Sequence, residues 1–220
     1  MNSNHGSVAS STIEKMLDIA EEMFSEQGYR SVSLRSVTKA CGMAPSAVHY
    51  HFGSKDALLK AIFARRAVPL TQARLKLLAE FERLDGGLRL ERIIQAFLQP
   101  GFFSSDEADT ANSRFIRLRT MIANEDAALF QELTSRYFDE SSRIFLGALK
   151  KALPNLPENS LYWRFHFLLG AQYYVLGNSA RIESLSHGLS SIRDPGIAMA
   201  ELVHFVASGF HAPTGPISTP

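Results

Sequence analysis

Cysteine is almost absent from this 220-residue chain, and Cys41 is its only example. A disulfide framework within one chain is therefore excluded, and a reducing cytoplasm is the expected compartment. No apolar run is long enough to span a bilayer. The polar start MNSNHGSVASS also lacks the cationic and apolar parts of a secretory signal. The sequence thus predicts a cytoplasmic protein without a membrane segment.

The motifs of common enzymes are lacking as well. The chain has no Gly-rich loop of the kind that cradles phosphates, no nucleophile elbow and no metal-ligand signature. His49 and His51 stand two residues apart, and on a helix such side chains point away from each other, which argues against a metal site. We therefore expect no enzyme activity, no cofactor and no metal. An enzyme acting on an apolar substrate stays open as a hypothesis that a screen with acyl substrates would test.

Net charge is small, but its distribution is uneven. The formal charge of +1 at pH 7 points to no particular partner. Between residues 28 and 66 the only acid is Asp56, whereas the basic residues there are Arg30, Arg35, Lys39, Lys55, Lys60, Arg65 and Arg66. A cationic segment within a neutral chain is typical of a surface that binds phosphates. On charge alone, an ordinary solvated face is an equally good interpretation.

Apolar residues recur at helical spacing in nearly every long segment, and no segment shows the alternation of a strand. The chain is therefore expected to be all-α. Ser10, Ser11 or Thr12 is expected to cap the first helix. Its apolar face comprises Ile13, Leu17, Ala20, Met23 and Phe24. Gly28 is expected to end this helix in the left-handed conformation.

The segment 37–55 has the layout of a helix-turn-helix. Ser33 is expected to cap a short helix, Gly42 to turn the chain, and Pro45 to open a second short helix. In such a motif the second helix enters the major groove of DNA. The pattern indicates a sequence-specific DNA-binding protein.

A long fourth helix follows, capped by Ser54 and reaching about Leu84. Pro69 lies within it, and proline inside a helix removes a backbone hydrogen bond and bends the axis. A bend there could mark a joint between a DNA-reading head and the body. An ordinary kink, or two helices that meet end to end, fits the sequence equally well.

The rest of the chain predicts a helical body, with a surface loop at 184–191. The expected helices lie near 88–100, 109–124, 126–152, 158–183 and 195–209. The helix at 158–183 is apolar on nearly all its faces, which is typical of a helix buried on all sides. A second copy of the chain would supply the extra cover, in a four-helix bundle made with the last helix. The expected interface residues are Trp163, Gly170, Tyr174, Gly177, Leu202, Phe205 and Val206.

The body is also rich in phenylalanine, and part of it could line an elongated apolar cavity for a small molecule. Arg117, which shares a helix face with Arg114, could meet an anionic head group, although a solvated face or a salt bridge is a simpler role. For His166, a place in the core or at an interface is a simpler role than ligand contact. The candidate ligand residues are Phe97, Phe115, Arg117, Met121, Phe138, Phe165 and His166.

The order and spacing of residues 13–60 make the pattern specific. Gly28-Tyr29, Cys41-Gly42-Met43 and VHYHFGSK at 48–55 closely resemble the DNA-binding head of the TetR family of transcriptional regulators. The resemblance implies an all-helical homodimer with about nine helices per subunit, a C-terminal ligand pocket, and binding to a near-palindromic operator. It also implies that Phe52 fills the small core of the head. The implied DNA-binding residues are Ser33, Arg35, Pro45, Ser46, His49, Tyr50, His51 and Lys55.

The chain departs from the family pattern at three positions in or just before the recognition helix. Ala44 replaces the usual serine, so a side-chain cap is lost, while Ser46 replaces a common glycine and His49 a common tyrosine. These changes leave the operator sequence open. The segment KKALPNLPENSLYWRFHFLLGAQ at 150–172 further resembles the branch of the family that responds to long-chain fatty acyl signals.

We therefore predict a lead-in at 1–10 and a tail at 211–220, both disordered, a helix-turn-helix domain at 11–56, and an effector-binding and dimerisation domain at 57–210. The predicted function is a repressor that a small apolar effector, such as a fatty acid or acyl-CoA, releases from a palindromic operator. Its predicted partners are duplex DNA, a second copy of the chain and that effector, with no membrane. The alternative is a small-molecule sensor or interaction scaffold with weak or absent DNA binding.

Overall fold

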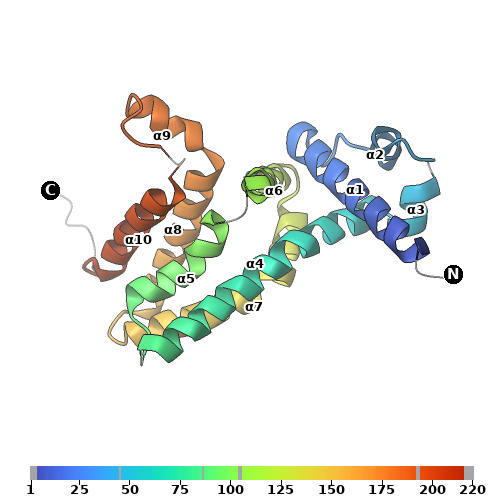
Figure 1. The fold of residues 1–220 in the computed structure, drawn as a ribbon. Coiled ribbons are helices and arrows are strands. Elements are labelled where there is room, and N and C mark those ends of the chain that lie inside the picture. The colour runs from blue at the N-terminus through green and yellow to red at the C-terminus, as the bar shows by residue number, and fades with distance from the viewer. Residues whose placement is uncertain (1–3, 45, 86, 104–105, 192–193, 216–220) are drawn as a thin grey trace. The chain divides into compact units, whose positions relative to one another are not determined.

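The computed structural model describes residues 4–44, 46–85, 87–103, 106–191 and 194–215. Within these ranges all regular structure is helical, which confirms the all-α prediction (Figure 1). The helices are α1 (Asn4–Gln27), α2 (Leu34–Cys41), α3 (Ser46–Phe52), α4 (Lys55–Asp85), α5 (Leu90–Phe102), α6 (Asp106–Glu125), α7 (Ala127–Ala152), α8 (Glu158–Gly177), α9 (Ser179–Leu185) and α10 (Pro195–His211). No described helix is both long enough and apolar enough to cross a membrane.

The chain divides into two compact units. The first unit comprises Met1–Val68 with Thr110–Tyr137, and the second comprises Pro69–Asp109 with Phe138–Pro220. The helix α4 runs through Pro69 without interruption, so the prediction of two helices meeting end to end is wrong. The boundary between the units nevertheless falls at this proline.

The helix ends of the first unit follow the predicted punctuation. Ser33 caps α2 with its hydroxyl, which accepts from the amide of Ser36 at 3.0 Å, and the Ser36 hydroxyl accepts from the amide of Ser33. Gly42 ends α2 at a φ of +69° and donates its amide to the carbonyl of Lys39. Ser54 caps α4 by accepting from the amide of Ala57 at 3.0 Å. Each cap satisfies backbone groups that a helix end leaves unpaired.

The start of α1 differs from the prediction. The helix begins at Asn4, so residues 4–10 are helical and the disordered lead-in expected there is wrong for this part. A serine is a good cap, but it costs only a few tenths of a kcal/mol inside a helix, whereas each residue added to an existing helix gains a backbone hydrogen bond. The capping signal at Ser10–Thr12 therefore does not stop the helix.

A buried ion-pair cluster joins α1 to α4 in the first unit. The side chain of Glu21 is fully buried, and its carboxylate accepts from Arg65 at 2.6 Å and from Arg66 at 2.9–3.0 Å. Arg65 also pairs with Glu14 and Asp18. Farther along α4, Lys60 pairs with Glu132 of α7 at 2.7 Å. Arg30 pairs with Asp126 at 3.5 Å. Four cations of the segment 28–66 are thus neutralised within the chain, and the surface for phosphates is smaller than its sequence implied.

We expect Glu21→Ala to lower the free energy of unfolding by about 3 kcal/mol, because two partly buried guanidinium groups lose their shared acceptor. Glu14→Ala is the control, since the Glu14 side chain is 58% exposed and such a pair contributes less than about 1 kcal/mol. Urea denaturation measures both changes. Equal effects of the two substitutions would contradict the assigned role of burial.

Aromatic packing dominates the core of the second unit. Phe97 of α5 makes edge-on contacts with Phe145 of α7 and Phe165 of α8, at centroid distances of 5.1 and 5.4 Å. The helix α10 packs on α5 and α8 (Figure 1). The buried guanidinium of Arg74 lies 3.8 Å from the Phe97 ring centre and donates to the Phe97 carbonyl and to Gln172. This polar group inside an apolar core carries no signal in the sequence.

Two predictions for the second unit are wrong in detail. The helix expected at 158–183 is divided into α8 and α9 at Asn178, whose side-chain amide donates to the carbonyl of Tyr174 at 3.3 Å. Asparagine competes in this way for backbone groups and favours helix ends. The tail expected to be disordered from residue 211 is bound in part, because Arg164 donates to the carbonyls of Phe210 and Ala212.

Candidate nucleic-acid interface

The helix α3 presents an open polar and aromatic surface. Ser46, His49 and Tyr50 are exposed, and Tyr50 is 85% exposed, which is unusual for a large aromatic side chain. His51 is half-buried, and its ring meets that of Tyr50 edge-on at 5.1 Å. The predicted position Pro45 lies outside the described residues. The turn at Gly42 and the cap at Ser54 set the limits of this short helix.

A hydrogen bond fixes the chemistry of the His49 ring. Its Nδ1 lies 3.0 Å from the carbonyl oxygen of Gly53. A carbonyl only accepts, so Nδ1 carries the proton, and the neutral ring presents Nε2 as an acceptor. An exposed acceptor on this helix suits an amino group on a base edge, either N6 of adenine or N4 of cytosine.

Lys55, the first residue of α4, is held toward the protein. Its Nζ donates to the carbonyl of Arg30 at 3.3 Å and lies 4.4 Å from the ring centre of Tyr29. The pKa of Lys55 is lowered, because desolvation by burial outweighs the opposing effect of the nearby carboxylates of Glu125 and Asp56. An ammonium has three donors, so two remain after the bond to Arg30. The side chain therefore has a packing role that the sequence did not indicate.

The remaining predicted DNA-binding residues lie on α2 or at its start. The Ser33 hydroxyl is engaged in the capping box, so it is not free to bind a phosphate. What Ser33 can present to a phosphate is the N-terminal end of α2. Arg35 and Lys39 are exposed cations on α2. Phe52, which was expected to fill the core of the head, is half-buried. Phe24 and Tyr29 are buried there, with rings 5.3 Å apart.

Sequence reasoning missed the residues that hold the turn after α1. Glu125 and Asp126, where α6 gives way to α7, contact Gly28 and Arg30 of that turn. Nearly a hundred residues separate the partners along the chain, so no local pattern links them. The one available signal was Gly28 itself, which was assigned only to the end of a helix.

The predicted ligand residues are divided between the two units. Phe97, Phe138 and Phe165 are buried in the second unit, where His166 is exposed. In the first unit Phe115 packs edge-on against Phe63 at 5.1 Å, Met121 lies close to Gly28, and Arg117 is exposed.

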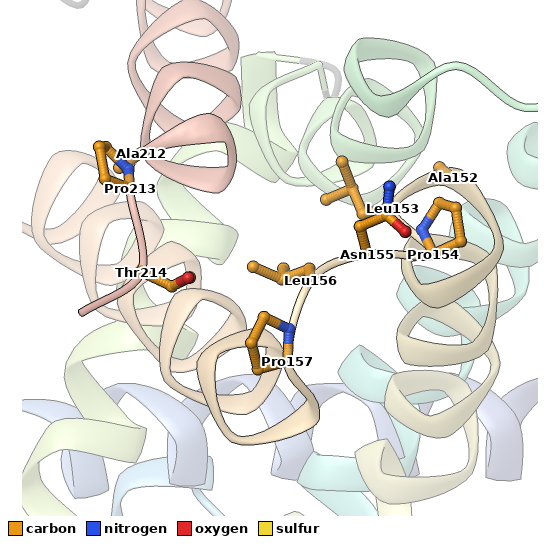
Figure 2. A pocket seen from close by; sticks show the side chains of 9 residues that line it. All are labelled: Ala152, Leu153, Pro154, Asn155, Leu156, Pro157, Ala212, Pro213 and Thr214. Atoms are coloured by element: carbon orange, nitrogen blue, oxygen red, sulfur yellow. The ribbon is translucent and has the colours of Figure 1, made fainter.

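A surface groove of about 390 Å³ lies in the second unit, between the α7–α8 connection and the residues after α10 (Figure 2). It is lined by residues 152–157 and 212–214. None of the predicted ligand residues lines it.

The predicted dimer residues fall into two groups. Trp163 and Tyr174 of α8 and Phe205 of α10 are 56%, 58% and 71% exposed, and Gly170 and Gly177 are exposed with them. Leu202 and Val206 are buried among the core residues of their own chain. On α10 the apolar residues occupy more than one face, and the sequence could not tell which of them meet α5 and α8.

The fold and this exposed short helix define an all-helical protein with an N-terminal helix-turn-helix. Residues 16–62 match the family model described as "Bacterial regulatory proteins, tetR family". Residues 95–209, more than half of the chain, match the model described as "Tetracyclin repressor-like, C-terminal domain". The chain belongs to the TetR family.

Curated relatives agree with this assignment. UidR of Escherichia coli (strain K12) is 39% identical over 62 residues, which are 28% of this chain and 32% of UidR. The chain thus matches about a third of the length of that relative. The repressor KstR2 of Rhodococcus jostii (strain RHA1) is 21% identical over 193 residues, covering 84% of this chain and 90% of KstR2.

Solved structures share the fold at low identity. A TetR-family transcriptional regulator from Bordetella parapertussis 12822 has a TM-score of 0.64 and 16% identity, covering 93% of this chain and 98% of that one. The fatty acid degradation regulator FadR from Bacillus halodurans has a TM-score of 0.62 and 13% identity, covering 90% and 95%. At these identities the likeness shows the fold alone.

We expect Lys55→Ala to lower the free energy of unfolding by about 1 kcal/mol, because it removes a hydrogen bond and a cation–π contact that are partly shielded from water. Lys39→Ala, at an exposed position of α2, is the control and should change stability by less than about 0.5 kcal/mol. Chemical denaturation checks both. A Lys55→Ala protein as stable as the control would contradict the packing role.

Proposed function

We propose that this protein is a homodimeric transcriptional repressor that binds a near-palindromic operator and leaves it when a small apolar or amphipathic effector binds the body. The observation that carries the proposal is the exposed face of α3, with Ser46, His49 and Tyr50 uncovered between two capped helices. A short helix so presented fits the major groove. Membership of the TetR family supports the same conclusion.

The proposed contacts divide by chemistry. Phosphate contacts from Lys55, Arg35, Tyr50, His51 and the start of α2 at Ser33 supply most of the affinity.

Base contacts from Pro45, Ser46 and His49 supply the discrimination between sequences. His49 reads adenine or cytosine through its acceptor Nε2, since Nδ1 is committed to Gly53.

The first test measures binding to DNA from upstream of the protein's own gene by fluorescence anisotropy, over a range of salt concentrations. Lys55→Ala is expected to weaken binding to all duplexes and to reduce the slope of log K against log salt by about 0.9. Lys76→Ala, at an exposed position of α4 in the second unit, is the control and should leave the slope unchanged. A slope unchanged in Lys55→Ala would count against the phosphate contact.

His49→Ala is expected to relax the preference at one base position in each half-site, by about 1–3 kcal/mol of discrimination. Binding to the other positions should keep its preferences. Sequence selection from random duplexes, with the wild-type protein and the variant in parallel, measures this directly. An identical selected sequence from both proteins would remove His49 from the reading surface.

The proposed dimer forms through the exposed aromatic face of α8 and α10. Trp163, Phe167, Tyr174 and Phe205 are each more than half exposed in the single chain. Exposed apolar patches of this kind mark protein interfaces. Pairing with a second copy would bury them and would place two α3 helices on one operator.

We expect Phe205→Glu with Trp163→Glu to give a monomer, because each copy then brings charge to the apolar seam. The matched control is Leu189→Glu, at a 92% exposed apolar position outside the predicted interface. Analytical ultracentrifugation at micromolar concentration measures the mass. A dimer that survives the double substitution would place the interface elsewhere.

We propose a fatty acid or acyl-CoA as the effector. The resemblance at 150–172 to the acyl-responsive branch supports this class, and the name of the similar structure FadR points the same way. Mass spectrometry of molecules that co-purify with the protein would name the ligand class. Recovery of polar metabolites alone would exclude the acyl proposal.

One observation favours the alternative of a sensor or scaffold with weak DNA binding. Lys60, Arg65 and Arg66 are held in ion pairs, so the cationic surface left near α3 is modest. A protein that ignores all duplexes at low ionic strength would establish the alternative.

A further inference from the structure

The turn after α1 is built around a carboxylate that comes from α6. Gly28 has a φ of +87°, and a Cβ on this residue would lie 2.1 Å from Oε1 of Glu125. The left-handed backbone conformation favours glycine here, and any Cβ would displace the Glu125 carboxylate from its present position. Met121, one turn earlier on α6, lies beside the same position.

The carboxylate of Glu125 is held beside Gly28 by a hydrogen bond from the backbone. Its Oε2 accepts from the backbone amide of Arg30 at 2.9 Å. The guanidinium of Arg30 pairs with the adjacent Asp126 at 3.5 Å. Because Asp126 also caps α7 by accepting from the amide of Leu129 at 3.0 Å, its own position is fixed. The bond from Leu129, with a smaller effect of Arg30, lowers the pKa of Asp126.

The other side of the same turn binds α4. The carbonyl of Arg30 accepts from Nζ of Lys55, and the hydroxyl of Tyr29 donates to Asp56. The amide of Arg30 is thus held by α6 and its carbonyl by α4. A displacement of Glu125 would free the backbone amide of Arg30, the residue whose carbonyl positions Lys55.

We propose that Glu125 is a positioning residue for DNA binding. It fixes the turn Gly28–Arg30, and with it the start of α2 and the ammonium of Lys55, at one place on the corner where α6 meets α7. The inference rests on the proposed operator binding. The consequence follows from the same contacts. Loss of Glu125 frees the turn, so it loosens the spacing that the dimer requires between half-sites and also weakens the phosphate contacts that Lys55 and the start of α2 make in each half-site.

The test compares operators that differ only in spacing. The operator is selected from random duplexes by the wild-type protein, and duplexes with one base pair added or removed at the centre are then measured by fluorescence anisotropy, together with a single half-site. Glu125→Ala is expected to lose about tenfold in affinity for the selected spacing, the equivalent of one charge-assisted hydrogen bond. It should lose less affinity for the altered spacings, and its loss on the single half-site measures the part that comes from Lys55 and the start of α2.

Three variants separate position from charge and from general damage. Glu125→Asp keeps the charge but withdraws the carboxylate from the Arg30 amide, so it should behave as Glu125→Ala does. Glu125→Gln keeps an acceptor oxygen and should retain the spacing preference. Glu132→Ala removes a different carboxylate of the first unit, one that binds Lys60 of α4 and not the turn, and should also retain it.

Amide hydrogen exchange at Arg30 gives a readout without DNA. The amide should exchange at least about tenfold faster in Glu125→Ala than in the wild-type protein or in Glu132→Ala. Unchanged exchange, or a spacing preference that survives Glu125→Ala, overturns the inference while the proposed function stands. A wild-type protein that enriches no duplex overturns the proposed function itself.

Discussion

The first unit depends on the fixed backbone of the turn Gly28–Arg30, which is held by hydrogen bonds on both sides of Arg30. A left-handed glycine ends α1, and its missing side chain leaves room for Glu125. The amide of Arg30 then binds α6 and its carbonyl binds α4. The turn of three residues that follows α1 is thereby joined to two helices that are distant in sequence, α4 and α6.

Some charged residues of the first unit form buried ion pairs and others stay exposed, and composition alone does not distinguish the two groups. Glu21 binds Arg65 and Arg66 out of contact with water and joins α1 to α4. Arg35 and Lys39 stay exposed on α2. A buried carboxylate requires partners because desolvation of an unpaired charge is costly. Some arginines of the cationic segment therefore form ion pairs that stabilise the fold, and only the remaining cations are available to bind phosphates.

Much of the fold and part of the candidate site follow from local sequence. Ser33, Gly42 and Ser54 act at the helix ends that their types predict, because capping depends on residues within three or four positions. The start of α1 and the break at Asn178 were missed, since in each place several weak local preferences compete. Phe52 was assigned to the core of the head by resemblance; it is half-buried, whereas Phe24 and Tyr29 are buried.

The sequence by itself determined the helical class and the punctuation of the helix-turn-helix, because these depend on periodicity and on neighbours a few residues away. The roles of His49 and Tyr50 on the short helix α3 came from the resemblance to the family. Only the tertiary structure decided which cations are neutralised, that Lys55 lies over Tyr29, that Leu202 and Val206 belong to their own core, and that Glu125 occupies the space beside Gly28. Those outcomes depend on which distant helices pack together, and a contact across nearly a hundred residues leaves no periodic trace in the chain.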